Sequence, residues 1–118
     1  MYSAKLLDYF HNPRHAGEIE NATAAVEASN PVCGDLMKLW VVVRDGQIVE
    51  ARFKVAGCVP AVACGSWLTE HITGRSVSDL AHVSPSQIES ALDGLPAASK
   101  HAALLAADVL KKLLEEIG

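Results

Sequence analysis

Apolar and polar residues alternate along two neighbouring segments in the first half of the chain. In the first segment, every second residue is apolar: Met37, Leu39, Val41 and Val43. In the second segment, the apolar positions are Val49, Ala51, Phe53 and Val55. Asp45-Gly46, between the two segments, is a preferred hairpin turn. A period of two is typical of a strand with one buried face, so these segments predict an antiparallel hairpin.

The chain before this hairpin predicts one helix and one further strand. Ser3 can cap a helix that runs to about Phe10, and Asn12-Pro13 ends it. Residues 22–28 are small and weakly patterned, which favours a strand. Together with the hairpin, this strand predicts a three-stranded antiparallel sheet.

The second half of the chain carries the start and stop signals of helices. Pro60 suits the first turn of a helix over 60–73, which Gly74 stops. Ser76 and Ser84 are start signals for two shorter helices, the second of which ends near Gly94.

The last helix is predicted over 96–117. Its apolar residues form one stripe: Ala103, Ala106, Leu110, Leu113 and Ile117. The order of helix, strands and helices predicts an α+β fold, with the small antiparallel sheet packed against several helices. A chain of 118 residues and 12.5 kDa fits a single domain over 1–118.

Composition and charge exclude several classes of partner. Half of the residues are hydrophobic and the net charge is −4 without a Lys/Arg stripe, so we expect a globular protein that binds no nucleic acid. The uncharged stretch from Val55 to Leu68 is shorter than the roughly 20 residues that cross a bilayer, so we expect no membrane span. The first residues lack an apolar signal core, and the expected location is cytoplasmic.

Three cysteines in such a chain predict reduced thiols, because cytosolic disulfides are rare and an odd number cannot pair completely. Folding the hairpin about Asp45-Gly46 brings Cys33 level with Cys58. Directly opposed strand residues have Cβ atoms about 4.5–5.5 Å apart, close enough for two thiolates to share a metal. Asp35 would project to the same side as Cys33 if the strand is regular.

Each cysteine alone is better explained as a small buried hydrophobe. Cys33 and Cys58 together, with a neighbouring carboxylate, favour an open site for zinc, iron or an iron–sulfur cluster. Cys64 lies inside a predicted helix among apolar residues, and we expect it in the core. His101 begins the last helix, and composition alone does not decide between a ligand and a packing residue. The remaining histidines are expected at the surface or in packing positions: His11, His15, His71 and His82.

Several blocks of the sequence resemble the IscU/NifU-type iron–sulfur cluster assembly scaffolds over essentially the whole chain. The most specific block is Pro31-Val32-Cys33-Gly34-Asp35. The other blocks are Tyr2-Ser3 with Asn12-Pro13-Arg14, Ala51-Arg52-Phe53-Lys54 with Gly57-Cys58, Leu68-Thr69-Glu70, and Leu95-Pro96 with His101 and Leu105-Ala106-Ala107-Asp108.

This resemblance implies that Cys33, Asp35, Cys58 and His101 bind iron or a [2Fe–2S] cluster, and that zinc can occupy the same donors in purified protein. It implies a fold like that of IscU and SufE, a cysteine desulfurase as the sulfur donor, and acceptor proteins for the finished cluster. It implies a carrier without catalytic residues. Thiolates suit iron and sulfide, whereas a carboxylate or imidazole ligand helps a transient cluster to leave.

The chain departs from the family pattern at two places. The pattern ends in His-Cys, whereas this chain has His101-Ala102, so the third cysteine is missing and Cys64 is a candidate to replace it. The segment from Leu95 to Lys100 resembles only loosely the Leu-Pro-Pro-Val-Lys segment that a dedicated Hsp70-type chaperone recognises. Docking to that chaperone is therefore not expected.

Two alternatives to the scaffold hypothesis stay open at this point. The missing third cysteine is compatible with a zinc-binding acceptor of persulfide sulfur, and also with a binding module that only regulates a desulfurase. The residues leave open the number of irons in the cluster. They also leave open a homodimer, for which Tyr2 is a candidate contact.

Overall fold

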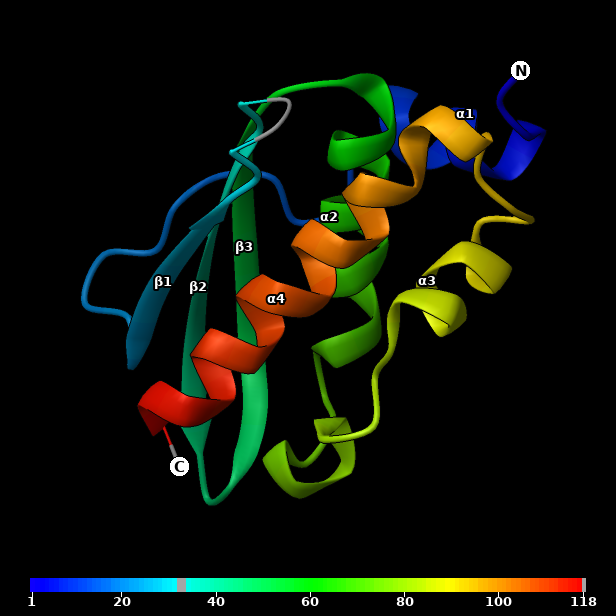
Figure 1. Cartoon of the computed structure of the whole chain (residues 1–118). Coiled ribbons are helices and arrows are strands. Elements are labelled where there is room, and N and C mark those ends of the chain that lie inside the picture. Colours follow the sequence, from blue (N-terminus) through cyan, green and yellow to red (C-terminus); the bar gives the residue numbers. More distant parts are fainter. Residues whose placement is uncertain (32–33, 118) are drawn as a thin grey trace.

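The computed structural model describes residues 1–31 and 34–117. Figure 1 shows the sheet on one side of the molecule and the helices packed against one of its faces. In chain order the elements are α1 (Ala4–His11), β1 (Ala24–Ser29), β2 (Leu36–Arg44), β3 (Gln47–Ala56), α2 (Val59–Ile72), η1 (Val77–Leu80), α3 (Pro85–Ala91), η2 (Ala97–Ser99) and α4 (Lys100–Ile117).

The sheet has the strand order β1-β2-β3, and both neighbouring pairs are antiparallel. Helix α4 packs on β1 and β2, and α2 packs on β3 and α4. The inner face of β2 is fully buried at Met37, Leu39 and Val41. The predicted α+β fold, with a three-stranded antiparallel sheet covered by helices, is confirmed.

The predicted alternation of buried and exposed residues in the second strand of the hairpin is wrong near the turn. Val42 pairs with Glu50 and Val43 pairs with Ile48, so β3 carries an extra residue, Val49, at this point. A bulge reverses the alternation of side chains beyond it. Ile48 is consequently fully buried, whereas Val49, predicted to face the core, is 44% exposed.

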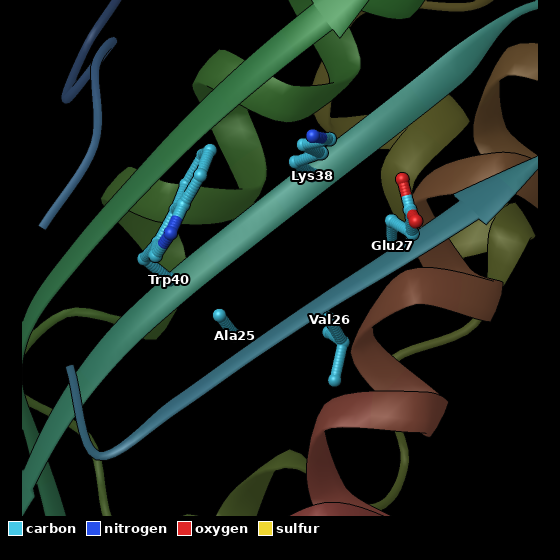
Figure 2. A pocket seen from close by; sticks show the side chains of 5 residues that line it. All are labelled: Ala25, Val26, Glu27, Lys38 and Trp40. Carbon is cyan, nitrogen blue, oxygen red and sulfur yellow. The ribbon is translucent and has the colours of Figure 1, made fainter.

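Within residues 1–31 and 34–117, no helix covers the opposite face of the sheet (Figure 1). Ala25 lies directly across from Trp40 in the β1–β2 register. Because alanine is small, a hollow of about 230 Å³ remains beside the indole, between Ala25, Val26, Glu27, Lys38 and Trp40. Figure 2 shows these side chains on the two strands.

Helix α2 is the most buried helix of the chain. Ten of its residues are buried, because the sheet, α1, α3 and α4 all contact it. Its range matches the predicted helix over 60–73. The last helix begins at Lys100, after a 3₁₀ turn at Ala97–Ser99, and its predicted stripe is buried from Ala103 to Leu113. The segment after Ser76 forms only a single 3₁₀ turn.

A cluster of side chains from both sides of the Asn12-Pro13 turn holds α1 against α2. The Arg14 guanidinium lies 4.1 Å from the centre of the Tyr9 ring and forms ion pairs with Asp8 at 2.8 Å and Glu70 at 3.4 Å. The Arg14 backbone N–H donates to Ser66 Oγ. The predicted N-cap also forms, since Ser3 Oγ accepts a hydrogen bond from Leu6 N.

No helix within 1–31 and 34–117 has both the length and the apolar character needed to span a membrane.

Candidate metal centre

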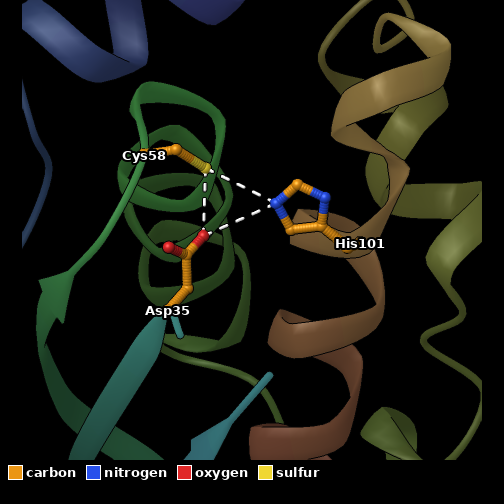
Figure 3. A group of neighbouring side chains, drawn as sticks. All are labelled: Asp35, Cys58 and His101. Carbon is orange, nitrogen blue, oxygen red and sulfur yellow. Dashed lines mark hydrogen bonds and ion pairs between the residues drawn. The ribbon is translucent and has the colours of Figure 1, made fainter. Parts of the chain in front are cut away.

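Three donor side chains from distant parts of the chain converge at one end of the sheet. Cys58 Sγ lies 3.1 Å from Asp35 Oδ2 and 3.7 Å from His101 Nε2. The same carboxylate oxygen lies 3.5 Å from His101 Nε2. Figure 3 shows the three side chains pointing toward one another. One donor atom from each lies within 4.8 Å of the other two, which is the geometry of a metal-binding group.

The hairpin places Asp35 next to Cys58. Leu36 and Ala56 are partners in the β2–β3 register, so the residues just beyond them leave the sheet side by side. Cys58 then becomes the N-cap residue of α2, where Pro60 occupies the first turn. The position of Asp35 beside Cys58 therefore follows from the turn at Asp45-Gly46 and from the start of α2.

His101 reaches the same point from the other side. It lies in the first turn of α4, and α4 packs against α2 and β1. The 3₁₀ turn at Ala97–Ser99 directly before it turns the chain into the helix. The next residue, Ala102, is fully buried and supplies no donor atom.

Burial and the neighbouring Asp35 carboxylate both raise the pKa of the Cys58 thiol. Burial raises the pKa of Cys58 to about 11, and the hydrogen bond that the thiol donates to Asp35 acts in the same direction. Asp35 is only 6% exposed, and the side chain of His101 is 27% exposed. The thiol must lose its proton before it can bind a metal, so metal binding here releases a proton. Sulfur, oxygen and nitrogen donors together suit zinc or iron.

The predicted partner of Cys58, Cys33, lies outside the described residues. Gly34, the next described residue, has a φ of +77°, and its N–H donates to the carbonyl of Asn30. Asn30 N–H in turn donates to the backbone carbonyl of Asp35, so this hydrogen bond holds the backbone of Asp35 beside Asn30. The meeting of Cys33 with Cys58 stays a prediction.

Cys64 lies in the core, as expected. It is fully buried in α2, and burial raises its pKa to about 12. Within the described part of the chain, the three-donor group does not include Cys64. The structure therefore gives no support to Cys64 as a substitute for the third cysteine.

The other histidines lie away from the group. His71 stacks on Trp67 with 4.6 Å between ring centres, whereas His11 and His82 are exposed and His15 is half-buried. The predicted packing and surface roles of these histidines fit these positions.

The contact that the sequence did not reveal is between Gly57 and Asp35. In the sequence, Gly57 stood out only as part of the Gly57-Cys58 block of the family resemblance. In the structure Gly57 lies directly against the Asp35 carboxylate. This contact depends on the pairing of Leu36 with Ala56, which the bulge at Val49 shifts by one residue from a plain count along the hairpin.

The profile of the NifU-like N-terminal domain family matches residues 1–116. The chain belongs to this family. Two named relatives cover nearly the whole chain. It is 39% identical to the iron–sulfur cluster assembly scaffold protein IscU 1 of Archaeoglobus fulgidus over 97% of its own length and 74% of the archaeal protein. It is 36% identical to the scaffold protein IscU of Escherichia coli K12 over 98% of its own length and 92% of the bacterial protein.

Solved structures confirm the NifU-like fold. A structure named for the SUF-system scaffold of Fervidobacterium islandicum AW-1 superposes with a TM-score of 0.80, at 22% identity, over 96% of each chain. The N-terminal region of a NifU-like protein from Brucella abortus superposes with a TM-score of 0.66, at 15% identity, over 97% of this chain and 81% of that one. The family match and the named relatives confirm the resemblance seen in the sequence blocks.

Proposed function

We propose that this chain is a scaffold on which an iron–sulfur cluster of the [2Fe–2S] type is assembled and from which it passes to acceptor proteins. The observation that supports this most directly is the convergence of Asp35, Cys58 and His101 in a member of the NifU-like family. Cys33 would be the fourth ligand. The whole chain, 1–118, would act as one scaffold domain.

These ligands suit a cluster that is passed on to another protein better than a permanently bound cofactor. Thiolates hold iron strongly, whereas a carboxylate and an imidazole are harder donors that a receiving thiolate can displace. His101 and Cys58 are also partly exposed, so an acceptor can reach the cluster from outside. The chain would hold and release a cluster without catalytic residues of its own.

The sulfur would come from a cysteine desulfurase in the cytoplasm. Its enzyme-bound persulfide would pass the outer sulfur to a cysteine thiolate of the scaffold. The scaffold cysteine then becomes a persulfide and the enzyme leaves as a thiolate, so this step needs no oxidant. A reductant is needed later, when the sulfane sulfur becomes the sulfide of the cluster.

A zinc-bound persulfide acceptor is the second candidate. It is favoured by Ala102, which is buried beside His101 and leaves the described site with Cys58 as its single thiol. In this case Cys58 would accept persulfide sulfur without building a cluster.

Anaerobic reconstitution with ferrous iron and sulfide distinguishes the two functions. We expect the wild-type protein and Cys64→Ala to develop the visible charge-transfer absorption of a [2Fe–2S] cluster, and Cys33→Ser and Cys58→Ser to develop little. Cys64→Ala is the matched control because it removes a thiol from the core. Colour in no variant, together with tight zinc and persulfide on one cysteine, would decide for the second candidate.

A further inference from the structure

Gly57 directly precedes Cys58 and packs against the carboxylate of Asp35. A Cβ atom at position 57 would lie 2.6 Å from Asp35 Cγ, 2.6 Å from Asp35 Oδ1 and 3.0 Å from Asp35 Cβ. Non-bonded carbon atoms prefer separations of roughly 3.5–4.0 Å. Any side chain at position 57 therefore displaces the Asp35 carboxylate from its present place.

The need for glycine at this position is spatial. Gly34, on the other arm, has a φ of +77° and open space around it, so its backbone conformation explains the glycine. Gly57 is not among the residues with a positive φ. The space taken up by the Asp35 side chain is what remains to explain Gly57.

The displaced carboxylate would leave its two partners. Asp35 Oδ2 lies 3.1 Å from Cys58 Sγ and 3.5 Å from His101 Nε2, while Oδ1 is on the side of Gly57. With Asp35 only 6% exposed, the side chain has little free space in which to adjust. A shift of Oδ2 would change its distances to both Cys58 Sγ and His101 Nε2.

We propose that Gly57 is the positioning residue of the metal centre, because its missing side chain leaves the space in which Asp35 meets Cys58 and His101. This inference rests on the proposed function for the identity of the ligands. Residues that orient metal ligands typically change metal affinity about 10–100-fold when they are altered.

A double-mutant cycle with zinc tests this role. Zinc affinity is measured on the full chain, under reducing conditions, by competition with a chromophoric chelator. We expect Gly57→Ala to weaken zinc binding about 10–100-fold in the wild-type background, and by less than about twofold when Asp35→Ala is already present. Unchanged affinity in the wild-type background, or an equal loss in both backgrounds, would overturn the proposal.

Gly65→Ala is the matched control. A Cβ atom there would also lie 2.6 Å from another side chain, but that side chain is Phe53, in the core under α2. We expect this variant to lose stability and to keep zinc affinity within about twofold of wild type. If Gly65→Ala weakened zinc binding as much as Gly57→Ala does, the effect would come from general strain in α2. That result would overturn the proposal.

A crystal structure of metal-free Gly57→Ala separates this proposal from the proposed function. We expect Asp35 Cγ to move away from position 57 while α2 and the sheet stay in place. An unmoved carboxylate would overturn the positioning role. If wild-type protein neither binds zinc nor forms a cluster on reconstitution, the proposed function fails, and the crystal structure still decides the role of Gly57.

Discussion

The Cys58 thiol lies 3.1 Å from the Asp35 carboxylate and donates a hydrogen bond to it. This pair joins the end of β3 to the start of β2, and a negative charge beside a thiol favours the protonated form. Burial acts in the same direction, and the pKa of Cys58 is raised to about 11. Without metal, the site therefore holds its sulfur as a thiol at neutral pH.

Alkylation should reveal the protected state of Cys58. With a pKa of about 11, only about 0.1% of the side chain is thiolate at pH 8. We expect iodoacetamide to react slowly with Cys58 in a Cys33→Ser/Cys64→Ala background, and the rate to rise up to about pH 11. Asp35→Asn should lower the apparent pKa, because it removes the negative charge beside the thiol.

The control for this measurement is a short peptide that contains Cys58 without the fold. An ordinary thiol pKa in the folded protein, equal to that of the peptide, would contradict the role of burial and Asp35.

Zinc binding should strengthen as pH rises. The raised pKa of Cys58 means that the metal displaces a proton throughout the neutral range, so affinity grows by about tenfold per pH unit for each proton released. Chelator competition at about pH 6.5, 7.5 and 8.5, all at least about 2.5 units below the thiol pKa, measures this slope. An affinity that does not change over this range would contradict the prediction.

Cys64 should be the slowest thiol to react. It is fully buried, and burial raises its pKa to about 12. We expect mass spectrometry after native alkylation at pH 8 to find Cys58 modified before Cys64, and denaturant to remove the difference. Rapid native modification of Cys64 would show that α2 opens or that this cysteine lies elsewhere.

Arg14→Ala should destabilise the docking of α1 modestly. Its ion pairs with Asp8 and Glu70 are largely exposed and contribute little, so the main loss is the contact with the Tyr9 ring. We expect the free energy of unfolding to fall by about 1 kcal/mol in urea titrations, the usual size of a partly exposed cation–π contact. Arg52→Ala, which removes an ion pair with Glu50 on the open sheet face, is the control and should change stability by less than about 0.5 kcal/mol. An equal loss in both variants would contradict a special role for Arg14.

The order and type of the main elements could be predicted from the sequence because they depend on local chemistry. The period of two around Asp45-Gly46 predicted β2 and β3, and Pro60 with Gly74 predicted the range of α2. The nearly equal arms of the hairpin predicted that Cys33 meets Cys58 with the Asp35 carboxylate nearby, and the structure brings Asp35 to Cys58. That these residues hold a cluster stays a prediction.

The tertiary structure alone decided three features. The bulge that exposes Val49 depends on packing along the whole sheet, because local alternation gives no sign of an extra residue. His101 joins Cys58 from 43 residues further along the chain, and only the packing of α4 on α2 and β1 brings them together. The steric need for Gly57 exists only once Asp35 lies against it. Local sequence patterns fix the elements, whereas contacts between distant elements depend on how the complete core packs.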